Sequence, residues 1–310
     1  MKRNGLLKKI VLVGLVFIAL LLSVACSSQT KGSELVTIHE QLPLAGQTSV
    51  AGAKETFDNG GSVDTTSLQN GSVTVNANLA GKGIIGIQAN VEGNQKLKVK
   101  VSLGENAVYY NIRPGQMIKV PMQMGSGTYR IELYQNISGT DYARLYSRDL
   151  TVALENENDV YLSSSQIVNF ENSVGSMGLA AKLTQNARSD MDKLDAIYRY
   201  VVGNITYDYD EVNRIDPAYI PDIDTVLYGK KGICYDYAAV MASLLREAGI
   251  PAKLLMGYRS DAESYHAWNQ ALINGRWITL DATWDSVLRQ NGQPYTMEKD
   301  AGLYRAEKYF

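Results

Sequence analysis

Residues 232–238 read Gly-Ile-Cys-Tyr-Asp-Tyr-Ala and open the strongest helical pattern in the chain. Apolar residues recur on one helix face through residues 241–248, and Gly249 ends the pattern. Cys234 is therefore expected at or just before a helix N-terminus. There the free backbone N–H groups and the positive end of the helix dipole favour the thiolate, which is the nucleophilic form of cysteine.

A β-hairpin is predicted about thirty residues after this cysteine. Residues 265–273 read Tyr-His-Ala-Trp-Asn-Gln-Ala-Leu-Ile, with apolar and polar positions alternating as in a half-buried strand. The Asn-Gly pair at 274–275 is a strong signal for a two-residue turn, and residues 276–281 return as a second strand. A loop of this length pairs Ile273 with Arg276.

The same register predicts how two polar residues of the hairpin meet. Extended along both strands, it places His266 opposite Thr283 and Trp268 opposite Asp281. His266 and Asp281 then become diagonal neighbours on one sheet face, with Cα atoms ~7–8 Å apart. Asp281 is expected to hold one ring nitrogen of His266 and to leave the other facing Cys234.

Four stretches together resemble a known enzyme core. They are Gly-Ile-Cys-Tyr-Asp-Tyr-Ala at 232–238, Leu-Leu-Arg-Glu-Ala-Gly-Ile-Pro-Ala at 244–252, Tyr-His-Ala-Trp-Asn at 265–269 and Trp-Ile-Thr-Leu-Asp-Ala-Thr-Trp-Asp at 277–285. The segment from about 191 to 285 resembles the transglutaminase-like core of the papain-like cysteine enzymes. The resemblance implies that Cys234 is the nucleophile, His266 the general base and acid, and Asp281 the residue that orients the imidazole.

The chain departs from animal transglutaminases at the expected oxyanion donor. Those enzymes usually show Gly-Gln-Cys-Trp around the nucleophile and use a tryptophan upstream of it, whereas all three tryptophans here follow Cys234. Tyr207 is a candidate donor, and a packing role for it is the alternative. Trp268 and Trp284 are expected in the core, with an acyl-binding slot as the alternative.

The N-terminal half has strand periodicity instead. Short alternating runs separated by glycine-containing turns occur at residues 72–78, 97–101, 117–121, 129–134 and 146–152. They predict a β-sandwich-like domain over residues 41–160, with residues 41–71 unassigned in detail, followed by a transglutaminase-like domain over 161–310. The predicted fold class is therefore α+β, with the helix that carries the cysteine packed on an antiparallel sheet.

The first residues resemble a bacterial export signal. A basic start precedes an apolar run at 10–22, which is short for a span of a ~30 Å bilayer core. Leu-Ser-Val-Ala-Cys at 22–26 resembles a lipobox, so Cys26 is predicted to be lipidated after a signal peptide at 1–25, with a polar tether at 26–40. An ordinary cleaved signal with an incidental Cys26 is the alternative. Lipidation at Cys26 would make this an extracytoplasmic protein anchored to the bacterial cell membrane.

Charge and composition narrow the function classes. Four of the 30 basic side chains lie in the first 25 residues, so the remainder carries 26 basic against 32 acidic side chains. This acidic balance argues against a nucleic-acid partner. With Cys26 assigned to the lipobox, one cysteine remains and no second histidine lies near it, so the usual ligand count of a zinc site is not available. No calcium-loop pattern appears either, so neither a metal nor a cofactor is expected.

The predicted activity is attack of a cysteine thiolate on an amide bond of a peptide or protein at the cell surface or cell wall. Transfer of the acyl group to water would make the protein a protease or amidase, and transfer to an amine would make it a protein-glutamine transamidase. A third hypothesis is a non-catalytic surface protein that keeps the fold for binding or assembly.

Overall fold

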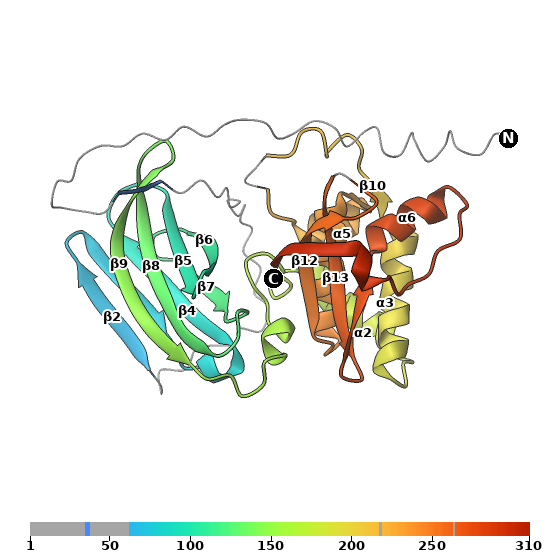
Figure 1. Cartoon of the computed structure of the whole chain (residues 1–310), viewed down its shortest axis with the longest axis horizontal. Coiled ribbons are helices and arrows are strands. Elements are labelled where there is room, and N and C mark those ends of the chain that lie inside the picture. The colour runs from blue at the N-terminus through green and yellow to red at the C-terminus, as the bar shows by residue number, and fades with distance from the viewer. Residues whose placement is uncertain (1–34, 38–61, 217–218, 263) are drawn as a thin grey trace.

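The computed structural model describes residues 35–37, 62–216, 219–262 and 264–310, which form a mixed α+β protein (Figure 1). The predicted signal peptide, Cys26 and most of the predicted tether lie outside these residues. No helix within the described ranges is long and apolar enough to cross a membrane.

The N-terminal part consists of two packed antiparallel sheets, as the alternating runs predicted. One sheet has the order β2-β3-β4-β7 and the other β1-β9-β8-β5-β6. Strands β2, β4 and β6 were not predicted, and β1 lies inside the segment assigned to the tether. The bounds are β1 (Leu35–Thr37), β2 (Val63–Leu68), β3 (Gly71–Asn76), β4 (Ile84–Val91), β5 (Leu97–Leu103), β6 (Asn106–Ile112), β7 (Met117–Pro121), β8 (Gly127–Ser138) and β9 (Asp141–Val152).

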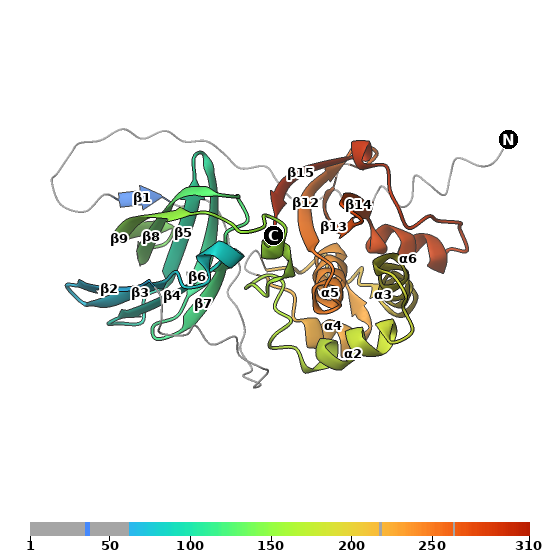
Figure 2. The same ribbon diagram turned by 90° about the horizontal axis from the view of Figure 1, so that it is seen from below.

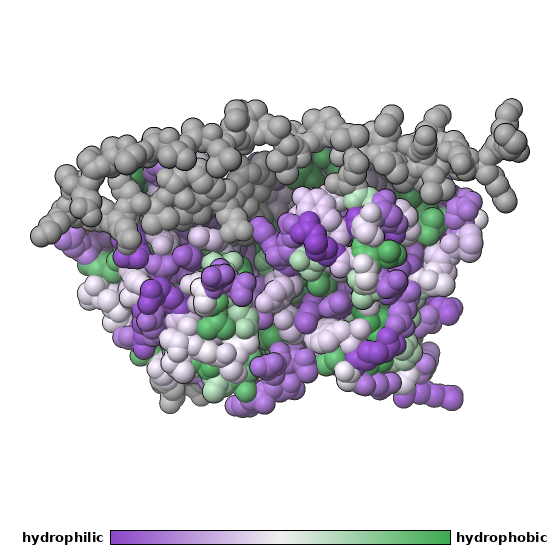
Figure 3. All heavy atoms as spheres, in the orientation of Figure 1, coloured by the Kyte–Doolittle hydropathy of each residue, from purple (hydrophilic) through white to green (hydrophobic). Residues whose placement is uncertain are grey.

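Alternation along these strands builds the core between the two sheets. Val99 and Val101 of β5 and Ile131 and Leu133 of β8 are all at most 1% exposed, and they point to the same side because strand side chains alternate. The alternate positions carry more polar side chains, such as Lys98, Lys100 and Glu132, although Lys98 and Glu132 are themselves buried. On the visible face in Figure 3, hydrophilic residues accordingly predominate, with small apolar areas between them.

The C-terminal part is a four-stranded antiparallel sheet with helices against it (Figure 2). The sheet order is β14-β13-β12-β15, and α5 packs on β12 and β13, with α2, α3, α4 and α6 around it. The bounds are α2 (Val174–Thr184), α3 (Asp190–Asn204), β10 (Thr206–Tyr207), α4 (Ile223–Gly229), β11 (Lys231–Gly232), α5 (Cys234–Glu247), β12 (Ala252–Arg259), β13 (Tyr265–Ile273), β14 (Arg276–Leu280), α6 (Ala282–Gln290) and β15 (Tyr304–Tyr309).

The predicted hairpin register is confirmed only as far as Leu280. Ile273 pairs with Arg276 and Asn269 with Leu280, around a turn in which Asn274 and Gly275 both have positive φ, 51° and 77°. The predicted pairing of His266 with Thr283 and of Trp268 with Asp281 is wrong. The strand ends at Leu280 because the chain turns into α6, and Thr283 lies inside that helix.

Side-chain hydrogen bonds join the sandwich to the C-terminal part. Lys119 of β7 contacts Glu171 at 2.7 Å, and Gln166 donates to the Asn111 carbonyl at 2.8 Å. Gln123 donates from Nε2 to the carbonyl of Tyr309 at 2.7 Å, so the sandwich contacts the last strand of the C-terminal sheet.

The buried guanidinium of Arg246, on α5, fixes the end of that strand. It donates to three carbonyls: Ala252 at 2.7 and 2.9 Å, Ser163 at 2.7 Å and Phe310 at 2.9 Å. Burial lowers the pKa of Arg246 to about 9, because water no longer solvates its charge. The three carbonyls replace that water, so Arg246 joins α5 to Ser163 and to the residue that follows the last strand, Phe310.

We predict that Arg246→Met lowers the free energy of unfolding by about 3 kcal/mol, because it leaves buried carbonyls without a donor. Arg289→Met is the control, since Arg289 is exposed near the end of α6. Urea unfolding followed by circular dichroism measures both variants. Equal midpoints for the two variants would contradict the role given to Arg246.

Candidate active site

Cys234 is the first residue of α5, as predicted. Its helix starts after Ile233, whose backbone N–H donates to the carboxylate of Asp236 at 2.8 Å. A Cβ on Gly232 would lie 2.7 Å from the Cβ of Asp236, so only glycine fits where the chain enters the helix. Cys234 is half-buried and belongs to the first turn of the helix, where backbone N–H groups have no partner within the helix.

His266, on β13, contacts both other members of the predicted triad. Its Nε2 lies 2.9 Å from Oδ2 of Asp281, and the His266 ring also interacts with the Cys234 side chain. The ring stacks near Trp268, with centroids 6.4 Å apart and planes 18° apart. The structure therefore brings Cys234, His266 and Asp281 together, although Asp281 reaches His266 from a helix cap and not from a paired strand position.

Asp281 is fully buried at the junction of β14 and α6. Its Oδ1 accepts a hydrogen bond from the backbone N–H of Trp284 at 2.9 Å, which caps the helix. Its Oδ2 accepts from His266 and from the hydroxyl of Tyr304, each at 2.9 Å. The carboxylate is thus held on both oxygens before any substrate binds.

The charges of this pair follow from these contacts. Burial alone would lower the pKa of His266, but the negative charge and hydrogen bond of Asp281, with a contribution from Cys234, outweigh it and raise that pKa to about 10. Burial would raise the pKa of Asp281, yet His266 and the hydrogen bonds hold it below its usual value. The arrangement therefore favours a protonated His266 beside an ionised Asp281.

Tyr207 is placed close to the cysteine by a short parallel pairing. Strands β10 and β11 pair Tyr207 with Gly232, two residues before Cys234. Burial and the negative charge of Cys234 raise the pKa of Tyr207 well above its usual value. Its hydroxyl therefore stays protonated and can donate a hydrogen bond near the sulfur.

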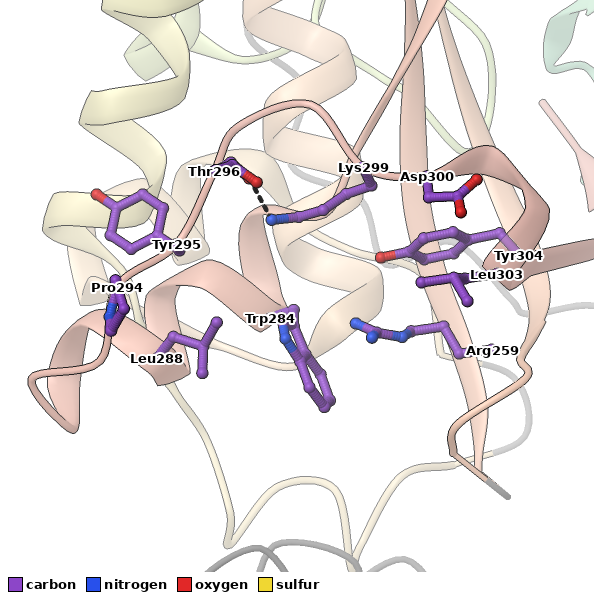
Figure 4. A pocket seen from close by; sticks show the side chains of 10 residues that line it. All are labelled: Arg259, Trp284, Leu288, Pro294, Tyr295, Thr296, Lys299, Asp300, Leu303 and Tyr304. Carbon is purple, nitrogen blue, oxygen red and sulfur yellow. Dashed lines mark hydrogen bonds between the residues drawn. The ribbon is translucent and has the colours of Figure 1, made fainter.

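Two residues missed by the sequence analysis also lie beside Asp281. Tyr304 comes from β15, and Arg259 comes from β12, with its Nη1 3.7 Å from Oδ2 of Asp281. Figure 4 shows both side chains, with Trp284 and Lys299, in the lining of a cavity of about 400 Å³. No local sequence signal marks Arg259 or Tyr304, since their role depends on which strands become neighbours.

The aromatic and amide residues near the triad are largely structural. Trp268 is 2% exposed and belongs to the core, as expected. Trp284 is half-buried, lines the cavity and packs against the Arg259 guanidinium at 3.8 Å from its ring centroid. Asn269 is buried and donates to the carbonyls of Ala238 and Lys253 at 2.9 and 3.1 Å.

Two acidic residues between β10 and α4 are bound by nearby groups of the chain. Asp208 pairs with Lys231 at 3.0 Å, and Asp222 accepts from the backbone N–H of Thr225 to cap α4. In the part of the chain that the structure describes, no group of three or more His, Cys, Asp or Glu side chains is placed to hold a metal ion.

Comparison with known proteins identifies the segment that carries this geometry. Residues 177–282 match the family model described as the transglutaminase-like superfamily. Mouse kyphoscoliosis peptidase is 30% identical over 120 residues, which cover 36% of this chain and 18% of that protein. YebA of Bacillus subtilis, an uncharacterized protein, is 38% identical over 84 residues, which cover 26% of this chain and 11% of YebA. The chain thus spans less than a fifth of either relative.

A solved structure is also similar: the periplasmic domain of TgpA from Pseudomonas aeruginosa, bound to ethylmercury. It has a TM-score of 0.35 at 15% identity, and the alignment covers 65% of this chain and 94% of that one. The family model contains Cys234, His266 and Asp281 within its matched residues. Residues 177–282 are therefore a transglutaminase-like domain within this chain.

Proposed function

We propose that the protein is a cysteine-nucleophile enzyme that cleaves amide bonds of peptides or proteins through a thioester intermediate. One observation carries the proposal: Cys234 begins α5 beside His266, and the far ring nitrogen of that histidine is held by Asp281 at 2.9 Å. A nucleophile, a base and a residue that orients the base are the three parts that acyl transfer needs.

The reaction follows from the charges of the site. The Cys234 thiolate attacks the carbonyl carbon of the amide, and the bonding electrons move onto the carbonyl oxygen. His266, protonated at the start, gives its proton to the leaving nitrogen as the carbon–nitrogen bond breaks. The acyl group remains on sulfur as a thioester. His266 then takes a proton from water, whose oxygen attacks the thioester and releases a carboxylic acid and the cysteine.

The negative oxygen formed on attack needs donors close to the sulfur. The backbone N–H of Cys234, at the positive end of α5, supplies one. Tyr207 supplies the second in this proposal, because its pairing with Gly232 brings it beside the cysteine and its raised pKa keeps its hydroxyl a donor. It would take the place of the tryptophan used by animal transglutaminases.

Water is the proposed acyl acceptor, so the activity is that of a peptidase or amidase. One named relative, kyphoscoliosis peptidase, supports this choice by its description, although the chain covers only 18% of it. Transfer to an amine is the second candidate, since the thioester reacts with either acceptor. The lipobox-like stretch ending at Cys26 supports an extracytoplasmic, membrane-anchored enzyme whose substrates lie at the cell surface or cell wall.

We predict that iodoacetamide alkylates Cys234 at pH 6 faster than it alkylates free cysteine by at least about tenfold, because free thiols ionise only near pH 8.5. The rate should stay nearly constant up to pH 9, since His266 remains protonated until about pH 10. His266→Ala should remove this plateau. Mass spectrometry of the alkylated protein, with Cys26 replaced by serine, measures the rate at one thiol only.

An alkylation rate that rises with pH as for free cysteine would exclude an ion pair between Cys234 and His266.

The raised pKa of His266 also sets the pH range in which its contact with Asp281 stabilises the fold. Contact with Asp281 raises the pKa of His266 from 6.5 to about 10, so this pair stabilises the fold fully below about pH 6.5. That stabilisation is lost as the pH rises through about 10.

We predict that Tyr207→Phe lowers kcat/KM for hydrolysis of peptide anilides by about a hundredfold, which is the usual effect of removing one oxyanion donor. The alkylation rate of Cys234 should stay within about twofold, because alkylation forms no oxyanion. Tyr209→Phe is the matched control, since Tyr209 is exposed and packs on Tyr207 from two residues away. Equal losses in both variants would contradict the assignment.

We predict that Cys26→Ser leaves the protein unprocessed or releases it from the membrane, because serine lacks the thiol that receives the lipid. Fractionation of bacterial cells followed by immunoblotting gives the location and size of the product. A substituted protein that remains in the membrane fraction at the mature size would rule out lipidation at Cys26.

A further inference from the structure

The carboxylate of Asp281 is shared between His266 and a residue outside the matched family segment. Its Oδ2 accepts one hydrogen bond from His266 and one from the Tyr304 hydroxyl, both at 2.9 Å. Tyr304 is the first residue of β15, which pairs with β12 at the edge of the sheet. A second neighbour, Arg259, lies directly across this pairing from Tyr304.

We propose that Tyr304, supported by Arg259, is a positioning residue that shares the Asp281 carboxylate with His266 and so limits how strongly Asp281 stabilises the protonated His266 ring. The inference rests on the proposed function, because it concerns the base of that reaction. A donor on Oδ2 withdraws negative charge from the oxygen that faces the imidazole. The imidazolium can then release its proton to the leaving nitrogen more readily.

Arg259 acts on the same oxygen through its charge. The side chain is 7% exposed, and its Nε and Nη2 donate to Asp261 at 2.8 and 2.6 Å. Its Nη1 is buried and makes no hydrogen bond to a described residue, and it lies 3.7 Å from Oδ2 of Asp281. The guanidinium packs between Trp284 and Tyr304, with its carbon 3.8 and 5.2 Å from the two ring centroids (Figure 4). This packing fixes the cation next to the carboxylate.

Other titratable groups near His266 and Asp281 make contacts of their own. Asp285, on α6, accepts from the hydroxyl of Tyr198 on α3 and pairs with Lys299 at 2.5 Å. Cys234, on α5, interacts with the His266 ring. Among the side chains described around Oδ2, Tyr304 and Arg259 are therefore the groups that compete with His266 for its charge.

Tyr304→Phe removes the hydroxyl and keeps the ring that packs on Arg259. The Asp281 charge then falls more fully on His266, so we expect the titration midpoint of His266 to rise by about one pH unit, a tenfold change in proton affinity. The chain has two histidines, so ring resonances of a sample labelled with ¹³C-histidine give two titration curves, and His39→Gln assigns them. Circular dichroism at each pH restricts the analysis to folded protein.

Tyr309→Phe is the matched control. Tyr309 lies on the same strand and is 37% exposed, so loss of its hydroxyl should leave the His266 midpoint within about 0.2 units. A purely structural role for Tyr304 would lower the melting temperature without moving the midpoint. A midpoint that stays unchanged or falls in Tyr304→Phe overturns the inference.

A double-mutant cycle tests whether Tyr304 acts through Asp281. In the Asp281→Asn background, Tyr304→Phe should shift the midpoint by less than a third of its effect in the natural sequence, because the shared charge is gone. An equal shift in both backgrounds overturns the inference. The readout is independent of turnover: loss of the proposed function would appear as no peptide hydrolysis with the expected midpoint shift still present.

Discussion

A single buried carboxylate connects most of the elements around the site. Asp281 has no exposure to water, and an ionised carboxylate is costly to bury unless hydrogen-bond donors and positive charge replace its hydration. Here the donors come from three places: the first turn of α6, His266 on β13 and Tyr304 on β15. Each donor must reach one of the two oxygens of this carboxylate. Asp281 therefore constrains where α6 begins and how β13 and β15 align.

The local parts of this arrangement were predictable from sequence. The helix that starts at Cys234 and the Asn-Gly turn depend on neighbouring residues, and both were found where predicted. The contact between His266 and Asp281 was also predicted, but the register behind it fails after Leu280. The predicted register requires the second strand to continue to Thr283. Asp281 instead caps a helix, and there the backbone turns away from the sheet.

The remaining parts depend on contacts between distant segments. Tyr304 lies 23 residues from Asp281 and Arg259 lies 22 residues from it, and no periodicity in either strand indicates which strand will be the neighbour. In the sandwich, β4 was missed because it begins with consecutive buried residues, Ile84 to Ile87, which do not alternate. Such runs carry no period that distinguishes a strand from a buried helix.

The position of β15 has a consequence for how this domain is delimited. The family match stops at residue 282, before Lys299, Tyr304 and the Phe310 carbonyl that Arg246 binds. A polypeptide trimmed to the matched residues would keep the cysteine helix and the histidine hairpin. It would also expose the unpaired edge of β12, a surface on which strands of other molecules can add. For this chain, the four-stranded sheet is therefore complete only with β15, which lies beyond the segment that the family model matches.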